Sequence, residues 1–112
     1  AAGRVHHGRA IDAPGAPIAL LTPGHTDGHC AYLFEDEGIL ISGDALVTLD
    51  PYTGEAGPQI VARAATADAA EAMRSLDVLS GTGAGVVLPG HGVPFFDGAR
   101  AAAHEARVRG PH

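Results

Sequence analysis

The sequence predicts an α/β protein in which a mixed β-sheet is flanked by helices. Four short segments, either continuously apolar or alternating, are bounded by glycine, proline or acidic turns, which is typical of strands. Two longer segments repeat apolar or alanine residues at helical spacing. The elements follow in the order strand, strand, strand, helix, strand, helix, and the 112 residues are within the usual size of one domain.

The first half of the chain is predicted to hold three strands. Residues 1–17 are rich in Gly, Pro and Ala, and we expect a loop or an edge segment there. The run 18–22 is apolar and stops at a Pro-Gly turn, and 29–35 alternates in the manner of a half-buried strand. The run 39–41 is apolar on both faces, which predicts a central strand. The polar, turn-rich segment 50–58 is expected to be a long loop.

The second half is predicted to hold two helices around one strand. Thr66 is expected to be the N-cap of a helix over 67–80, with acidic residues near its positive end. The run 86–88 is a short buried strand that ends at another Pro-Gly pair. Asp97 is expected to cap a last helix over 98–109, which has a weakly apolar stripe of alanines.

Charge and cysteine content exclude several classes of partner. The cationic residues are 7 Arg and no Lys, and the 13 Asp and Glu give a net charge of −6. This balance argues against nucleic acid and against an anionic membrane surface. No apolar run approaches the roughly 20 residues that a bilayer span requires. The one cysteine, Cys30, excludes an internal disulfide and fits a reducing compartment, so we expect a cytoplasmic location.

Three polar residues follow directly after predicted strands, each beside glycine. They are His25, Asp44 and His91. Two imidazoles and a carboxylate suit Zn²⁺, Fe²⁺ or Mn²⁺, and loops at strand ends are a common place for such ligands. Histidine in a Pro-Gly turn is also ordinary, so the spacing alone leaves a metal site and a set of plain turns both open. The metal hypothesis requires that the three groups converge at one rim of the sheet.

Around these residues the chain resembles the metallo-β-lactamase-fold hydrolases. The motifs are TPGHTDGH over 22–29, ISGDAL over 41–46 and LPGHG over 88–92, in this order. The resemblance covers nearly the whole chain and implies an αββα sandwich with one or two metal ions at the edge between two sheets. Glyoxalase II enzymes of this family share the TPGHT and GD sequences but usually differ around the last histidine. The LPGHG motif therefore resembles a generic, glyoxalase II-like branch of the family.

The resemblance also implies roles for the three residues. His25 is similar to a histidine of the first metal site, Asp44 to the carboxylate that bridges both metals, and His91 to a histidine of the second site. Zn²⁺ is the expected metal, with Fe²⁺ or Mn²⁺ as alternatives. Family members use metal-activated hydroxide on a carbonyl or phosphoryl centre, so the expected small-molecule substrate is an ester, thioester, lactone or phosphoester. An iron oxygenase of the same fold stays open, because the ligand types overlap.

One family signature is absent. The HxHxDH motif supplies most of the remaining ligands, whereas here only His6 and His7 come early and no aspartate follows at that spacing. We therefore expect residues 1–112 to be a single partial domain, the C-terminal half of the metallo-β-lactamase fold. This partial domain alone is expected to bind metal weakly and to turn over little substrate.

Other residues receive supporting roles or none. The family pattern implies that His29 packs under the ligand loop, and Thr26 is placed with it as a supporting residue. Tyr52 and Glu55 are candidates to line a substrate loop. Cys30 is expected to be a buried core thiol. The remaining polar candidates, expected to be turn, surface or terminal residues, are Asp27, Arg63, His104 and His112.

A second hypothesis is a non-catalytic half-domain. A lone half of a sandwich would expose one apolar sheet face. Such a chain would form a homodimer or pair with a separate N-terminal half. A stable dimer without metal would favour this hypothesis, and metal binding with hydrolysis would favour the enzyme.

Overall fold

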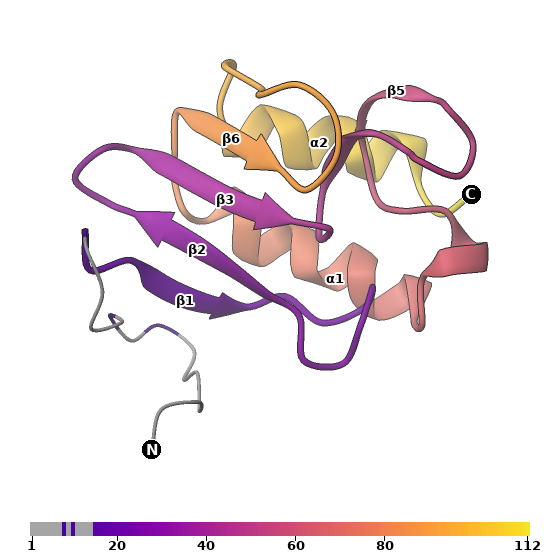
Figure 1. Ribbon diagram of the computed structural model, residues 1–112, viewed down its shortest axis with the longest axis horizontal. Helices are drawn as coiled ribbons and strands as arrows, with labels where there is room; N and C mark the ends of the chain where they lie inside the picture. Colours follow the sequence, from indigo (N-terminus) through magenta and orange to yellow (C-terminus); the bar gives the residue numbers. More distant parts are fainter. Residues whose placement is uncertain (1–7, 9, 11–14) are drawn as a thin grey trace.

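The computed structural model describes Gly8, Ala10 and residues 15–112. The strands are β1 (Ile18–Leu21), β2 (Cys30–Phe34), β3 (Ile39–Gly43), β4 (Val47–Leu49), β5 (Ala56–Gln59) and β6 (Val86–Pro89). The helical elements are η1 (Arg63–Ala65), a short 3₁₀ turn, α1 (Ala69–Ser80) and α2 (Ala99–Arg109). The predicted α/β class is confirmed, with both α-helices on one side of the main sheet (Figure 1). No helix among the residues described is long and apolar enough to cross a bilayer.

The main sheet is mixed, in the order β1-β2-β3-β6. The β1–β2 and β2–β3 pairs are antiparallel, and the β3–β6 pair is parallel, with α1 in the connection between them. β3 therefore lies inside the sheet, as the run 39–41 predicts. It also follows that β1, β3 and β6 run in the same direction and β2 runs against them, as the arrows in Figure 1 show.

The core lies between the sheet and the two helices. Alternate residues of the strands, among them Leu33, Leu40 and Val87, face this layer and are buried. They pack in one cluster with Leu76 and Leu79 of α1. The predicted stripe of α2 completes the cluster with four buried alanines, Ala99, Ala102, Ala103 and Ala106. The small side chains let α2 pack closely in this layer.

The opposite face of the sheet is less covered by the described residues. Leu21 and Ile41 are 41% and 36% exposed, although both belong to strands of the main sheet. Cys30 lies on β2 one position away from the buried Ala31 and is only half-buried, with its thiol 3.5 Å from the Gly28 carbonyl. The expectation of a core thiol is wrong, because strand alternation turns Cys30 to the face that the helices do not cover.

The segment 50–58, expected to be a loop, contains part of a small second sheet. β4 and β5 pair antiparallel, with Val47 opposite Gln59 and Leu49 opposite Ala56, and an irregularity in the register. The two strands have only three and four residues, and β5 contains Gly57 and Pro58. Proline and glycine weaken a strand signal, and pairing with a neighbour decides the outcome here.

Both helices begin later than expected. α1 begins after Asp68, whose carboxylate accepts the Glu71 N–H, while the Thr66 hydroxyl donates instead to the Val61 carbonyl. α2 begins after Gly98, which has a φ of 99° and no side-chain cap. The predicted caps Thr66 and Asp97 are therefore wrong by one to two residues. Asp68 is also a preferred N-cap residue type, so for α1 residue type alone does not choose between Thr66 and Asp68.

Asp50 anchors the turn between β4 and β5. Its carboxylate is fully buried and accepts N–H groups from Tyr52 at 2.8 Å, Thr53 at 3.3 Å and Ala62 at 2.8 Å. Burial alone would raise the pKa of this carboxyl, but the three donors outweigh burial and hold the pKa below its ordinary value of 3.8. The ionised carboxylate therefore stabilises the folded chain.

We expect Asp50→Asn to lower the free energy of unfolding by about 1–3 kcal/mol at neutral pH, since an amide NH₂ would face one of the three N–H donors. Because the folded-state pKa is depressed, this stabilisation is complete above the unfolded pKa. It is lost as the pH falls through the folded pKa. Urea unfolding at several pH values should show that the difference in free energy of unfolding between the parent chain and Asp50→Asn becomes smaller in acid. Asp36→Asn, in an exposed turn, is the control. A difference in free energy of unfolding that stays constant with pH would contradict the lowered pKa of Asp50.

Candidate metal centre

The three predicted site residues lie at the same edge of the sheet. His25 follows β1, Asp44 follows β3 and His91 follows β6. Because these three strands run in the same direction, their carboxyl ends come to one edge (Figure 1). The polar side chains at the ends of strands far apart in the sequence are thereby brought together.

Asp44 contacts both histidines. Its Oδ2 is 3.3 Å from Nε2 of His25, and its Oδ1 is 3.0 Å from Nδ1 of His91. His25 is the more buried of the two imidazoles, and its Nδ1 is buried without a hydrogen-bond partner among the described residues. Two imidazoles, a carboxylate and an unsatisfied buried nitrogen are a donor set that fits a divalent transition metal.

The Asp44 carboxylate directly contacts both imidazoles. Within residues 15–112 and the two described residues before them, no group of three His, Cys, Asp or Glu is arranged to hold an ion directly. Ligation by His25, Asp44 and His91 therefore stays a prediction, and it requires their side chains to turn from the contacts described. The partly exposed position of His91 leaves room for such a turn.

Gly90 makes space for Asp44. A Cβ atom at Gly90 would overlap Oδ1 of Asp44 and would lie 2.9 Å from the Gly43 carbonyl carbon. The Gly90 N–H also donates to the Gly43 carbonyl at 2.8 Å, so the turns after β3 and β6 touch through backbone. Glycine at position 90 is thus needed for the close approach of these two turns.

Helix α1 holds the loop that carries His25. The N–H groups of Ala67 and Asp68, just before α1, donate to the carbonyls of His25 and Gly24 at 3.2 and 2.8 Å. The Ser75 hydroxyl donates to the Pro23 carbonyl at 2.7 Å. Gly24 has a φ of 139°, and a Cβ there would overlap the backbone of α1. These contacts fix the main chain on both sides of the imidazole.

His29 lies beneath the same loop. Its Nε2 accepts the backbone N–H of Asp44 at 3.0 Å, and its Nδ1 is 2.8 Å from the Thr22 hydroxyl. Burial lowers the pKa of this imidazole, partly offset by the nearby carboxylate of Asp44. Thr26 is exposed, and its carbonyl accepts the N–H of Gly24 at 3.1 Å, so what it contributes to the turn comes from its main chain.

Tyr52 and Glu55 are not brought to the cluster by hydrogen bonds or ion pairs in the described part of the chain. The Tyr52 side chain is 67% exposed, and its N–H binds Asp50. Glu55 Oε2 is 3.4 Å from Nη1 of Arg109 at the end of α2. Their place in a substrate loop stays a prediction.

Among the described residues, none of the other candidates is hydrogen-bonded or ion-paired to the side chains of His25, Asp44 or His91. Asp27, Arg63 and His104 are exposed. The ring of His112 binds the Ile60 carbonyl at 3.1 Å. His6 and His7 lie outside the described residues.

Sequence reasoning missed the hydroxyl groups that support the site. Thr22 binds His29, and Ser75 binds the ligand loop. Thr48 of β4 donates its N–H to the His91 carbonyl and its hydroxyl to the Val93 carbonyl, at 3.0 and 2.6 Å. The sequence singles out Thr22 as a polar residue that ends an apolar run. It contains no comparable signal for Ser75 or Thr48, whose partners lie more than 40 residues away along the chain.

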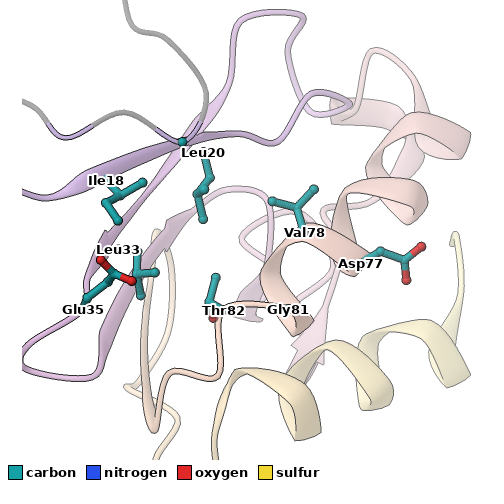
Figure 2. A pocket seen from close by; sticks show the side chains of 9 residues that line it. Ile18, Leu20, Leu33, Glu35, Asp77, Val78, Gly81 and Thr82 are labelled. Atoms are coloured by element: carbon teal, nitrogen blue, oxygen red, sulfur yellow. The ribbon is translucent and has the colours of Figure 1, made fainter.

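A separate pocket of about 460 Å³ lies between α1 and the β1–β2 edge (Figure 2). Its walls combine apolar and polar side chains, with Ile18, Leu20 and Leu33 on one side and Val78 on the other. It shares no residue with the histidine cluster. Of its acidic residues, Asp77 is ion-paired with Arg107 at 2.5 Å. The pocket therefore is no part of the candidate metal centre.

Comparison with known proteins identifies the family. The model of the Metallo-beta-lactamase superfamily matches residues 8–91, which include the three predicted ligands. The chain belongs to this superfamily. The superfamily has a metal-dependent hydrolase fold, and its members generally bind metals such as zinc or iron.

The chain is also similar in fold to several solved structures. A metallo-beta-lactamase family protein from Thermus thermophilus is 34% identical, over 93% of this chain and 33% of that one, with a TM-score of 0.67. A beta-lactamase domain protein from Burkholderia ambifaria has the same TM-score at 24% identity, over 96% and 32% of the two chains. TTHA1623, solved in a di-iron-bound form, is 25% identical over 88% and 45%, with a TM-score of 0.62. The chain spans about a third of the length of the first two.

Proposed function

We propose that this chain supplies His25, Asp44 and His91 as metal ligands of a metal-dependent hydrolase. The observation that carries the proposal is the position of Asp44, which has one carboxylate oxygen against each of two imidazoles from different strands. A carboxylate with both oxygens directed to different partners is suited to bridge two cations. Zn²⁺ is the expected metal. Fe²⁺ or Mn²⁺ is the alternative, and the di-iron form of a similar protein makes iron the stronger of these.

When bound, a metal ion at such a centre lowers the pKa of water and polarises the bond to be broken. The chain's own residues would orient this chemistry. His25 is held by α1, Asp44 by the turn after β3, and His91 by β4, so each ligand stands on a rigid support. The exposed side of His91 leaves access from solvent. The proposed substrate is an ester, thioester, lactone or phosphoester, in the generic branch near glyoxalase II.

Three ligands divided between two metal ions leave both incomplete. We therefore propose that the chain corresponds to the C-terminal half of the fold and that its metal affinity by itself is weak. The absence of HxHxDH from the sequence supports this proposal. Hydrolysis by the isolated chain should accordingly be slow.

Zinc titration against a chelating indicator tests the proposed ligands. We expect weak binding by the chain, and loss of that binding in His25→Ala and Asp44→Asn. His104→Ala, on the exposed side of α2, and a His6→Ala/His7→Ala double variant are controls that should bind as the parent does. Binding that survives both site substitutions and disappears in a control would contradict the proposal. Tight stoichiometric zinc with rapid hydrolysis would contradict the incomplete site.

A second function is favoured by one observation, the exposure of Leu21 and Ile41 on the sheet face away from the helices. The chain would then be a non-catalytic half-domain that pairs through this face with a second copy or a partner chain. Sedimentation without metal separates the two functions. A metal-free dimer that Ile41→Lys dissociates would favour the pairing function.

A further inference from the structure

The hydrogen bonds of His29 determine which of its nitrogens carries the proton. Nε2 is 3.0 Å from the backbone nitrogen of Asp44, and a backbone N–H can only donate. Nε2 must therefore accept with its lone pair. In a neutral imidazole the proton then lies on Nδ1, which donates to the Thr22 hydroxyl at 2.8 Å. Both ring nitrogens are thus occupied by the protein itself.

The neighbouring residues make this arrangement rigid. Thr22 is 1% exposed, and its N–H donates to the His29 carbonyl at 2.9 Å. Thr22 and His29 thereby join the two ends of the loop that carries His25. Gly43 has a φ of 53°, and a Cβ there would lie 2.8 Å from Nε2 of His29. Glycine at this position lets the ring reach the N–H of the next residue.

We propose that His29 is a positioning residue for Asp44, held by Thr22 in the Nδ1–H form and fixing the Asp44 main chain through Nε2. Thr22 and His29, bonded to each other at the two ends of the His25 loop, connect this loop to the start of the turn that carries Asp44. They therefore fix the separation of the two proposed ligands His25 and Asp44. His29 itself does not bind metal. The effect on metal binding rests on the proposed function, whereas the effect on Asp44 does not.

Nitrogen NMR of the metal-free chain tests the hydrogen bonds directly. We expect the His29 ring to carry its proton on Nδ1, and a scalar coupling to connect Nε2 with the Asp44 amide nitrogen. In Thr22→Val, which keeps the shape and removes the hydroxyl, the preference for the Nδ1–H form should weaken. A proton on Nε2 of His29 in the parent chain would overturn the proposal.

Two substitutions of His29 separate positioning from simple packing. In His29→Gln the side-chain oxygen can still accept the Asp44 N–H, whereas in His29→Leu nothing can. We expect His29→Leu to weaken zinc binding about 10–100-fold, the usual loss for a residue that orients a ligand. His29→Gln should recover most of that loss. His104→Leu, on the exposed face of α2, should change nothing.

Each result bears on the proposal separately from the metal function. Equal zinc affinity in His29→Leu and the parent would overturn it. Equal loss in the leucine and glutamine variants would overturn it too, because the loss would then not depend on accepting the Asp44 N–H. If the parent chain binds no zinc, the proposed function fails. The positioning role is then decided by the Asp44 side-chain couplings of the metal-free proteins. These should change in His29→Leu and recover in His29→Gln, and unchanged couplings in His29→Leu would overturn the proposal.

Discussion

Gly24→Ala is expected to lower the free energy of unfolding by at least about 2 kcal/mol, which is a large share of the stability of a small domain. Two causes act together. Gly24 has a φ of 139°, which alanine adopts only with strain, and the added methyl would overlap main-chain atoms of Ala72 in α1. Backbone cannot turn aside as a flexible side chain does. Either the His25 loop or α1 must therefore shift.

Urea unfolding measures this effect, with Gly28→Ala as a matched control. Gly28 lies in the same loop, and a Cβ there would meet no atom within 4 Å. The control should unfold within about 1 kcal/mol of the parent, because it adds a methyl group in open space. If Gly24→Ala were as stable as Gly28→Ala, the close packing of the His25 loop on α1 would be wrong.

Gly90→Ala should damage the site while leaving the sheet folded. The added Cβ would occupy the position of Asp44 Oδ1, so the carboxylate must leave the contact with His91. We expect a stability loss of about 1–3 kcal/mol, typical of overpacking. Zinc affinity should fall about 100-fold or more, because the variant displaces one proposed ligand and moves the turn of another.

Gly85→Ala is the control for Gly90→Ala. Gly85 directly precedes β6 and has open space around it, so the same substitution there should leave both stability and zinc affinity close to those of the parent. Chemical shifts of Asp44 and His91 report the displacement independently of metal. Unchanged shifts in Gly90→Ala would show that the carboxylate does not lie where this account places it.

The position of the three site residues could be predicted because it depends on strand direction. His25, Asp44 and His91 each follow an apolar run that ends in glycine, and in a mixed sheet such residues meet when their strands run in the same direction. The alternation along β2 likewise predicts that Ala31 and Leu33 share one side of the strand, and the structure buries that side, whereas the expected burial of Cys30 on the other side is wrong. Short-range patterns are sufficient for the strand ends and for the alternation, whereas the convergence of the three residues is implied by the family resemblance and depends on the pairing of distant strands.

Other features depend on contacts that no short pattern contains. β4 has only three residues, and β5 has four, of which two are Gly57 and Pro58, so neither strand is recognised before they pair. Thr66 has the residue type of a helix cap, but its hydroxyl binds the Val61 carbonyl instead. Ser75 supports a loop that lies 52 residues earlier in the chain. The Thr66 contact is local and the Ser75 contact is long-range, but both depend on the folded path of the chain and not on residue type alone.

Zinc-edge anomalous diffraction from crystals of the zinc-loaded chain tests the central claim most directly. The account predicts an anomalous peak about 2.0–2.2 Å from a nitrogen of His25 or His91 and from a carboxylate oxygen of Asp44. A peak held only by other histidines, such as His104 or His112, with Asp44 still paired to both imidazoles, would contradict it.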